Sequence, residues 1–412
     1  MFLMECRKIW RSFLFWIFAA AVLGAYLTQF APELTERMAK PVEGNGSYGS
    51  IVTKDPDVIR QKAVQNLVEE YLKGYYAAYP LLIYKEVFLK EDDSVRMAAI
   101  LEELTGMTKE ELDSFTDYEP AGFYMKEDGD GRQTGEYHEA VMPDYTPQEV
   151  SYERFLELME QADALIGGGS SYAEKKLALE FSTVPMDYAA AVEEYHAVVN
   201  RENIVEAYIR LYCDYMGIFL AILPVFTAAA FFDMDRRNNM GALIYSRKIS
   251  SVKIVGMRYG ALVFCMALPL LLTLLYTVLR LKGLYPEFDI VWQKGICLAV
   301  FWLLPELMTV IALGMVVTEL VSPLLAVLVQ GVWWYLSLGG NELKGAMTKW
   351  SLILRHNTLT GLHLFREEYP IFLWNRSFYL IAALALVAVE VFLFERKRKG
   401  MQKCVFGAKS LK

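Results

Sequence analysis

Three polar side chains lie inside long apolar stretches of this sequence, and their chemistry is the first thing to explain. Glu306 lies in "AVFWLLPELMTVIALG", Gln330 in "LLAVLVQGVWWYL" and Glu390 in "LALVAVEVFLF". A carboxylate or amide in hydrocarbon is costly unless it faces protein or water, so such groups line polar pathways or bond to a neighbouring helix. Glu306, Gln330 and Glu390 are therefore candidates for a polar pathway, and a buried hydrogen bond is the alternative.

A run of cations separates two apolar segments in the stretch "FFDMDRRNNMGALIYSRKISSVKIVGMRYG" at 231–260. Met240, Leu243, Ile244 and Ile249 form a short apolar stripe at helical spacing, with cations on the polar side. A helix of this kind is typical of a membrane surface, where its cations meet lipid phosphates.

The chain lacks the motifs of an enzyme. No G-x-x-x-x-G-K-[ST] sequence occurs in it, and no nucleophile is paired with a base. His356 and His363 could share a helix face, but no second pair of metal ligands accompanies them. We therefore expect no catalytic residue, no metal site and no cofactor in this chain.

The composition is that of a membrane protein with one acidic solvated region. Hydrophobic residues make up 55% of the 412 residues and charged residues 22%. Residues 31–210 contain 36 acidic and 17 basic side chains, whereas the rest contains 13 acidic and 24 basic ones. Such an acidic region would repel the phosphates of nucleic acid, so we expect no nucleic-acid partner. None of the five cysteines lies in that region, so it has no internal disulfide.

Six segments are long and apolar enough to cross a bilayer, which takes about 20 residues of α-helix. They are 12–30, 212–232, 259–280, 296–317, 321–338 and 377–394. Lys and Arg mark the cytoplasmic side, and they concentrate before the first span, in the 233–258 loop and after the last span. Six crossings place all three basic segments on one side. The sequence thus predicts a multi-pass protein of the bacterial cytoplasmic membrane, with both termini cytoplasmic and residues 31–211 extracytoplasmic.

The 31–211 region reads as an α-rich α+β domain. Amphipathic helices are predicted in 56–76 and 150–166, the second ending at Gly167, and a hairpin is predicted in 121–141 with its turn at 128–131. A further helix from about 188 to 210 is expected to enter the second span after bending near Asn200. The aromatic stretch 73–88 is a candidate binding surface or part of a core. Capping boxes are predicted at Thr108–Glu111, Thr146–Glu149 and Ser171–Glu174.

The 233–258 loop and the order of the spans resemble the permeases of ABC-2 type transporters. In that family this loop has an acidic residue, a Gly, a short hydrophobic helix, and a Ser followed by basic residues. The matching positions are Asp235, Gly241, Leu243, Ile244, Ser246, Arg247 and Lys248, followed by the basic stretch 253–258. The Pro that usually follows the Ser is absent here, and the insert after the first span is larger than in compact members.

The resemblance implies an all-α bundle of six transmembrane helices. The first span would lie in 1–30 and the other five in 212–400, with an interfacial or re-entrant segment at 339–376 and a basic cytoplasmic tail at 401–412. Residues 238–249 would form a coupling helix that docks on a separate cytoplasmic ABC ATPase, which binds the ATP and Mg. The docking residues implied are Asp235, Arg236, Arg237, Met240, Gly241, Leu243, Ile244, Ser246, Arg247 and Lys248.

The function implied is that of a permease subunit exporting a peptide, lipid or drug-like substrate. Six spans form half a pathway in this family, so the expected partners are a second permease copy or a homologous permease, the ATPase, and membrane lipid. Two alternatives remain open. One is a membrane sensor with an extracytoplasmic ligand-binding domain, and the other is an ion-coupled secondary transporter that uses Glu306.

Overall fold

The computed structural model describes residues 1–44, 48–80, 83–115, 118–119, 122–127, 133–138, 141–288, 291–338, 345 and 347–400. The chain forms two compact units, Met1–Gly46 with Asp187–Lys412 and Ser47–Met186. The predicted hairpin turn at 128–131 and the basic tail at 401–412 lie outside the described residues.

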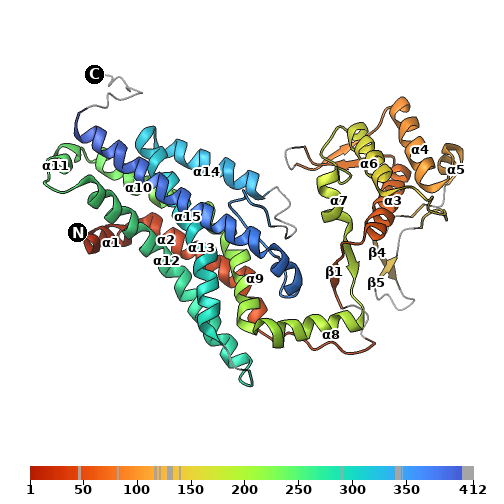
Figure 1. Cartoon of the computed structure of the whole chain (residues 1–412), viewed down its shortest axis with the longest axis horizontal. Coiled ribbons are helices and arrows are strands. Elements are labelled where there is room, and N and C mark those ends of the chain that lie inside the picture. Colours follow the sequence, from red (N-terminus) through yellow and green to blue (C-terminus); the bar gives the residue numbers. More distant parts are fainter. Residues whose placement is uncertain are drawn as a thin grey trace. The chain divides into compact units, whose positions relative to one another are not determined.

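The first unit is helical and apolar (Figure 1). Its helices are α1 (Phe2–Trp10), α2 (Phe13–Ala25), α8 (Tyr188–His196), α9 (Ile204–Leu220), α10 (Pro224–Arg237), α11 (Gly241–Tyr245), α12 (Ser251–Leu284), α13 (Trp292–Leu320), α14 (Pro323–Leu338) and α15 (Leu362–Arg398). The helical stretches Phe13–Leu34, Ser251–Leu284, Trp292–Leu320 and Leu362–Arg398 are each long and apolar enough to cross a membrane. The helices α9 and α10 qualify together as one span bent by 43°. The chain is therefore a helical, multi-pass membrane protein.

The predicted set of six spans is supported in part. The fifth predicted span corresponds to α14, whose 16 residues rise only about 24 Å, less than the roughly 30 Å of a hydrocarbon core. The structure thus supports four spans, or five with the bent pair, and the sixth stays a prediction. The last helix begins at Leu362 and not near 377, because apolar content marks only the part of a helix that lies in hydrocarbon.

A break separates α8 from α9, as predicted near Asn200. A π-helical turn covers Ala197–Glu202, and Asn203 follows with a φ of 78°. Its side chain then accepts a hydrogen bond from the Val205 N–H at 3.2 Å and caps α9.

The second unit, coloured orange to yellow-green in Figure 1, packs helices around one core. The helices are α3 (Pro56–Lys73), α4 (Glu91–Thr105), α5 (Lys109–Ser114), α6 (Tyr152–Ile166) and α7 (Glu174–Phe181). Three two-stranded antiparallel sheets pair β1 (Ser50–Val52) with β6 (Thr183–Pro185), β2 (Tyr76–Ala78) with β3 (Lys85–Val87), and β4 (Gly122–Glu127) with β5 (Gln133–His138). The predicted helices and the antiparallel hairpin are confirmed.

One of the three predicted capping boxes is present. Thr108 and Glu111 cap α5 reciprocally. The prediction at 146–149 is wrong, because α6 starts only at Tyr152 with Ser151 as its cap. The prediction at 171–174 is also wrong, because Ala173 precedes α7 and no side chain caps it. In both wrong predictions, the helix therefore starts later in the sequence than the motif indicates.

The aromatic stretch 73–88 contributes to both a core and a surface. Tyr76 is buried in the core of the second unit. Tyr79, Tyr84 and Phe88 are exposed, and the rings of Tyr79 and Tyr84 lie 5.9 Å apart. The core interpretation is therefore confirmed for Tyr76, and the binding-surface interpretation stays a prediction for the exposed rings.

Candidate functional site

The loop between α10 and α12 is short and mostly exposed. Its helix α11 covers five residues, Gly241–Tyr245, rather than the longer 238–249 rod that the resemblance implied. Met240 is 43% and Leu243 52% exposed, and Arg247 and Lys248 are exposed as well. The loop thus presents two apolar side chains beside two cations, a combination that suits a membrane surface as well as a protein partner.

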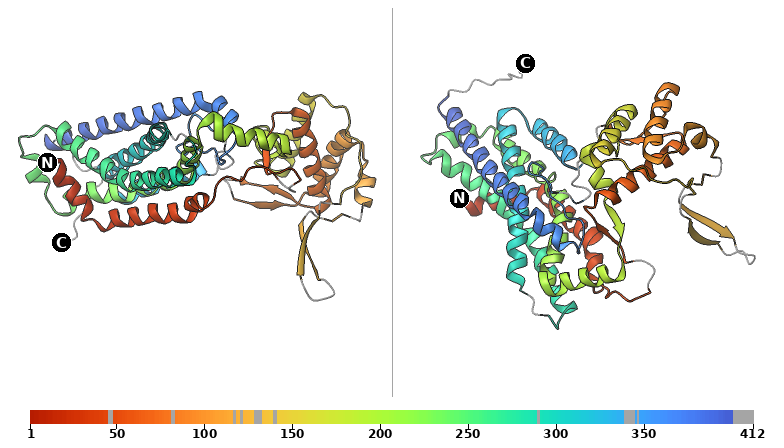
Figure 2. Two further views of the ribbon diagram at one scale, coloured as in Figure 1. Left: turned by 90° about the horizontal axis from the view of Figure 1, so that it is seen from below. Right: turned by 45° about the vertical axis from the view of Figure 1, so that its right-hand side comes forward.

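The end of α15 holds this loop in place. The Arg398 guanidinium donates to the carbonyl oxygens of Tyr245, Arg247 and Ile249 at 3.1, 2.6 and 2.7 Å. The rings of Tyr245 and Phe394 are 5.3 Å apart. Figures 1 and 2 show α11 at the same end of the unit as the end of α15. A displacement of the loop would therefore act directly on the last membrane helix.

A second set of contacts joins α12 to α10 and to α15 beside the loop. Arg258 Nη1 on α12 lies 2.5 Å from Asp235 Oδ2 on α10, and the Ser251 hydroxyl donates to the Glu395 carboxylate on α15. Three helices that flank the loop are thus cross-linked by charged or hydroxyl side chains.

A cavity of about 350 Å³ lies beneath these contacts. Asp235, Arg236, Ile244, Glu319 and Glu390 are among its lining residues. Lys397 Nζ pairs with Glu319 Oε1 at 2.6 Å, whereas Glu390 Oε2 has no hydrogen-bond partner within the described residues. Glu390 therefore belongs with the loop and not with the two other predicted pathway residues.

Glu306 lies deep inside the bundle and is paired. Its Oε2 lies 3.2 Å from Nη1 of Arg376 on α15, and neither side chain is exposed. The carboxylate packs against Gly217 on α9, where a Cβ would be in ordinary van der Waals contact with it, 3.5 Å from Oε2. The pair joins α13 to α15, which is the structural role that the sequence left as the alternative.

Gln330 supplies a hydrogen bond to the backbone at the break between α9 and α10. Its amide donates to the Ala221 carbonyl at 2.5 Å, and the Trp334 indole N–H donates to the Ile218 carbonyl at 2.9 Å. Residues 221–223 interrupt the helix before Pro224, so both carbonyls lose their helical partners. The helix α14 therefore supports a bend in the membrane with two polar side chains.

A buried, non-helical segment precedes α15. Leu352, Ile353 and Leu354 are completely buried, and the backbone around them lacks helical hydrogen bonds. Irregular backbone at membrane depth is stable only where protein satisfies its polar groups. The 347–361 segment therefore needs donors and acceptors from its neighbours.

Charged and amide side chains of α9 and α15 supply the donors and acceptors that the 347–361 segment needs. Asp214 accepts the N–H groups of His356 and Asn357 at 2.8 and 2.7 Å. Arg210 donates to the carbonyls of Leu359 and Thr360, and Asn375 donates to those of Thr348, Lys349 and Ser351. These three residues and Arg376, which donates to the Leu352 carbonyl at 3.3 Å, clamp the segment to the bundle.

One ring in this segment is held neutral. Burial is the largest of the effects that lower the pKa of His356 to about 3, and its Nε2 lies 2.9 Å from the Thr360 carbonyl. A carbonyl only accepts, so Nε2 carries the proton and donates. His356 therefore fixes the turn that leads into α15.

Sequence reasoning missed the residues of the clamp. Asp214 lies inside the predicted second span, just as Glu306 lies inside the fourth. The signal that marked Glu306, an ionisable residue in an apolar stretch, therefore applied to Asp214 as well. Arg210 and Arg376 lie at or just outside predicted span ends, where cations are ordinary. Only the fold shows that their side chains point inward.

Comparison with known proteins adds no likeness to this geometry. No family model matches the sequence, and neither the curated proteins nor the solved structures include a match. The candidate site therefore consists of the loop, its cavity and the clamp as this chain forms them.

Proposed function

We propose that this chain is the permease subunit of an ATP-driven ABC transporter of the bacterial cytoplasmic membrane, with a separate cytoplasmic ATPase docking on the 238–249 segment. The observation that carries the proposal is the attachment of Arg398 to three carbonyls of the loop. An ATPase that moves the loop would move α10, α12 and α15 with it, because side-chain contacts join all three to the loop or to each other.

The orientation required by the proposal agrees with the charge at this end of the bundle. The last turns of α10 and α15 carry Arg236, Arg237, Arg396, Lys397 and Arg398. Cations of this kind stay on the cytoplasmic side. Both termini would then be cytoplasmic, and residues 31–211 extracytoplasmic.

The bend at 221–223 gives the proposed motion a hinge. A push on α10 through the Asp235–Arg258 pair can change the angle between α10 and α9, because the break has already removed the helical bonds to the Ile218 and Ala221 carbonyls. In the proposed complex, two copies of this chain or one copy and a similar permease would enclose the pathway, and the exported cargo would be a peptide, lipid or drug-like molecule.

Photo-crosslinking tests the docking step directly. A benzoylphenylalanine at position 243 in the full-length chain, expressed in its native host, should crosslink to a polypeptide that carries a nucleotide-binding P-loop. The same probe at position 42, an exposed residue (60%) on the stretch that follows the first span, is the control. If position 243 yields only lipid or no adduct with an ATPase, the proposed docking is wrong.

Two sets of substitutions separate docking from transmission. Leu243→Asp with Arg247→Glu should abolish both the crosslink and the ATPase activity that the complex shows above that of the free ATPase. Arg398→Gln should keep the crosslink but lower that stimulated activity, because the loop is no longer held to α15. Lys40→Glu with Val42→Asp, a matched apolar and basic pair elsewhere in the first unit, should change neither. Normal stimulated activity in the Leu243 and Arg247 double variant would contradict the proposal.

A further inference from the structure

A second cavity, of about 670 Å³, lies at the other end of the membrane unit between α9, α13 and α15. It is remote from the basic loop, because α13 and α15 run parallel and the loop lies near their ends. Lys294 near the start of α13 and Arg366 near the start of α15 line this cavity, whereas the last turns of the same two helices meet at the Glu319–Lys397 pair. A pocket of this volume suits a drug-sized molecule or a lipid head group with part of its chain.

Aromatic and aliphatic side chains make up one part of the wall. Phe301, Phe365, Phe372, Tyr369 and Leu373 line the cavity. Tyr369 is 42% and Leu373 40% exposed, so this wall is open at the surface of the bundle. An apolar chain could lie here without leaving the hydrocarbon region.

Charges of both signs make up the other part. Glu202 and Glu206 line the cavity together with Lys294 and Arg366. Within the described residues, Glu206, Lys294 and Arg366 form neither an ion pair nor a side-chain hydrogen bond. Lys294 and Arg366 attract the Glu206 carboxylate across the cavity without a direct contact, so a ligand group can lie between the opposite charges.

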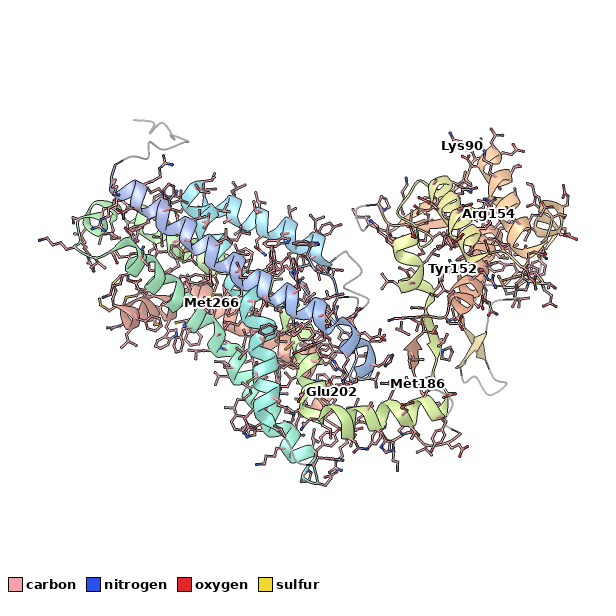
Figure 3. All side chains as sticks on the ribbon, in the orientation of Figure 1. Lys90, Tyr152, Arg154, Met186, Glu202 and Met266 are labelled. Atoms are coloured by element: carbon pink, nitrogen blue, oxygen red, sulfur yellow. The ribbon has the colours of Figure 1, made fainter. Side chains whose placement is uncertain are left out.

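Glu202 supplies a buried acceptor that lacks a donor. This residue, labelled in Figure 3 at the junction of α8 and α9, is 8% exposed. Arg210 pairs with its Oε1, whereas its Oε2 has no hydrogen-bond partner. A buried carboxylate oxygen without a donor is costly, so a ligand N–H here would be stabilising.

We propose that this cavity binds an amphiphile whose head group carries a primary ammonium beside a phosphate, as in phosphatidylethanolamine. The ammonium donates to Glu202 Oε2 and to Glu206, the phosphate lies against Lys294 and Arg366, and the acyl chain lies along Tyr369 and Leu373. A quaternary ammonium lacks the N–H that Glu202 needs, and a glycerol head group lacks the positive charge that Glu206 favours. The inference does not depend on ATP coupling, since the purified chain alone should bind.

Cys297 is a native reporter for this binding. It lines the cavity and is exposed, whereas Cys6, Cys213 and Cys265 are buried. In a Cys404→Ser background, the rate of its reaction with a maleimide in detergent should fall as the cavity fills. The probes are the lyso forms of phosphatidylethanolamine, phosphatidylglycerol and phosphatidylcholine with the same acyl chain. The ethanolamine form should protect Cys297 at the lowest concentration.

Substitutions then test each half of the head group. Glu206→Gln should weaken protection by the ethanolamine form about tenfold, the size of one lost bond between charged groups, and leave protection by the glycerol form unchanged. Arg366→Gln should weaken protection by both. Lys282→Gln, an exposed cation near the end of α12 that does not line the cavity, should weaken neither. Equal protection by all three lipids, or protection unchanged in both cavity variants, would overturn the proposal.

Discussion

Arg376 and Glu306 face each other between α15 and α13, with Nη1 3.2 Å from Oε2 and with both side chains wholly inaccessible to solvent. Each also keeps an atom without a partner in the described residues, Nε of Arg376 and Oε1 of Glu306. Burying two charges is costly, and the pair offsets that cost only while both members are present. The pair therefore restricts the packing of α13 against α15 to arrangements that keep the two charges together.

Removing one member of this pair should destabilise the protein far more than removing both. Arg376→Leu leaves Glu306 as an uncompensated buried charge, for which the expected loss is about 3–5 kcal/mol. The double variant Glu306→Leu with Arg376→Leu replaces the pair by apolar groups and should recover most of that loss. Thermal unfolding of the detergent-solubilised chain measures both, with Arg396→Leu as the control for a more exposed cation on the same helix. A double variant no more stable than Arg376→Leu would show that the charge pairing is not what matters.

Asp214 should control whether the 347–361 segment stays buried. Its carboxylate accepts two backbone N–H groups, and Asp214→Leu removes both acceptors at similar volume. We expect Ile353→Cys, at a position with 0% exposure, to become reactive toward a maleimide in that background. Asp214→Asn keeps one acceptor oxygen and should give an intermediate rate.

The matched control for this experiment is Asp233→Asn. Asp233 pairs with Arg236 near the end of α10 and does not contact the segment. The labelling is read in a Cys297→Ser and Cys404→Ser background. An Ile353→Cys side chain that stays unreactive with Leu at 214 would mean that Asn375 and Arg376 hold the segment without Asp214.

The sequence predicts the spans well where the signal is apolar length and poorly where it is polar contact. The helices at 13–34, 251–284 and 292–320 follow from runs of Leu, Ile, Val and Phe, which need no partner to be recognised. The ends of these helices extend beyond the apolar windows, because α12 begins at Ser251 with Ser250 as its cap, eight residues before the predicted span. A cap and a few polar residues in water cost little, so hydropathy does not detect them.

The clamp around 347–361 could not be predicted in the same way. The resemblance implies an interfacial or re-entrant piece before the last span, and the aromatic, amphipathic sequence there fits it. The sequence does not indicate that Asp214 on α9, about 140 residues away in the sequence, satisfies its backbone. Packing between helices decides which polar side chains meet over long sequence distances. A polar residue in an apolar run indicates that it has some partner, but not which one.

The stability of the folded chain should fall as the pH rises from about 5 to about 8, because of Glu202. Burial raises the pKa of this carboxyl from its ordinary 4.5 to about 7, and the attraction of Arg210 opposes the shift. A raised pKa means that the folded chain holds the proton more tightly, so this contribution to stability is fully present below the ordinary pKa and is lost as the pH rises through 7. The other charges near this carboxyl are Glu206 and Arg366.

Glu202→Gln should remove that part of the pH dependence. The measurement is the unfolding temperature in detergent at several pH values. The quantity compared is the slope of unfolding temperature against pH in wild type minus the same slope in the variant. His363→Gln is the control, because His363 lies 3.3 Å from Glu194 and does not line this cavity. Identical slopes for wild type and Glu202→Gln would show that Glu202 does not titrate in this range.

The two ends of the membrane unit should react from opposite sides of the membrane. The basic loop and the Cys297 cavity lie at opposite ends of α13 and α15, and the proposed orientation puts the loop in the cytoplasm. A maleimide that cannot cross membranes should therefore label native Cys297 in intact cells and leave Arg247→Cys, in a Cys297→Ser and Cys404→Ser background, unlabelled until the cells are opened. Labelling of Arg247→Cys from the outside would place the loop away from any cytoplasmic ATPase and would exclude the transporter proposal, while the lipid proposal for the Cys297 cavity would still stand.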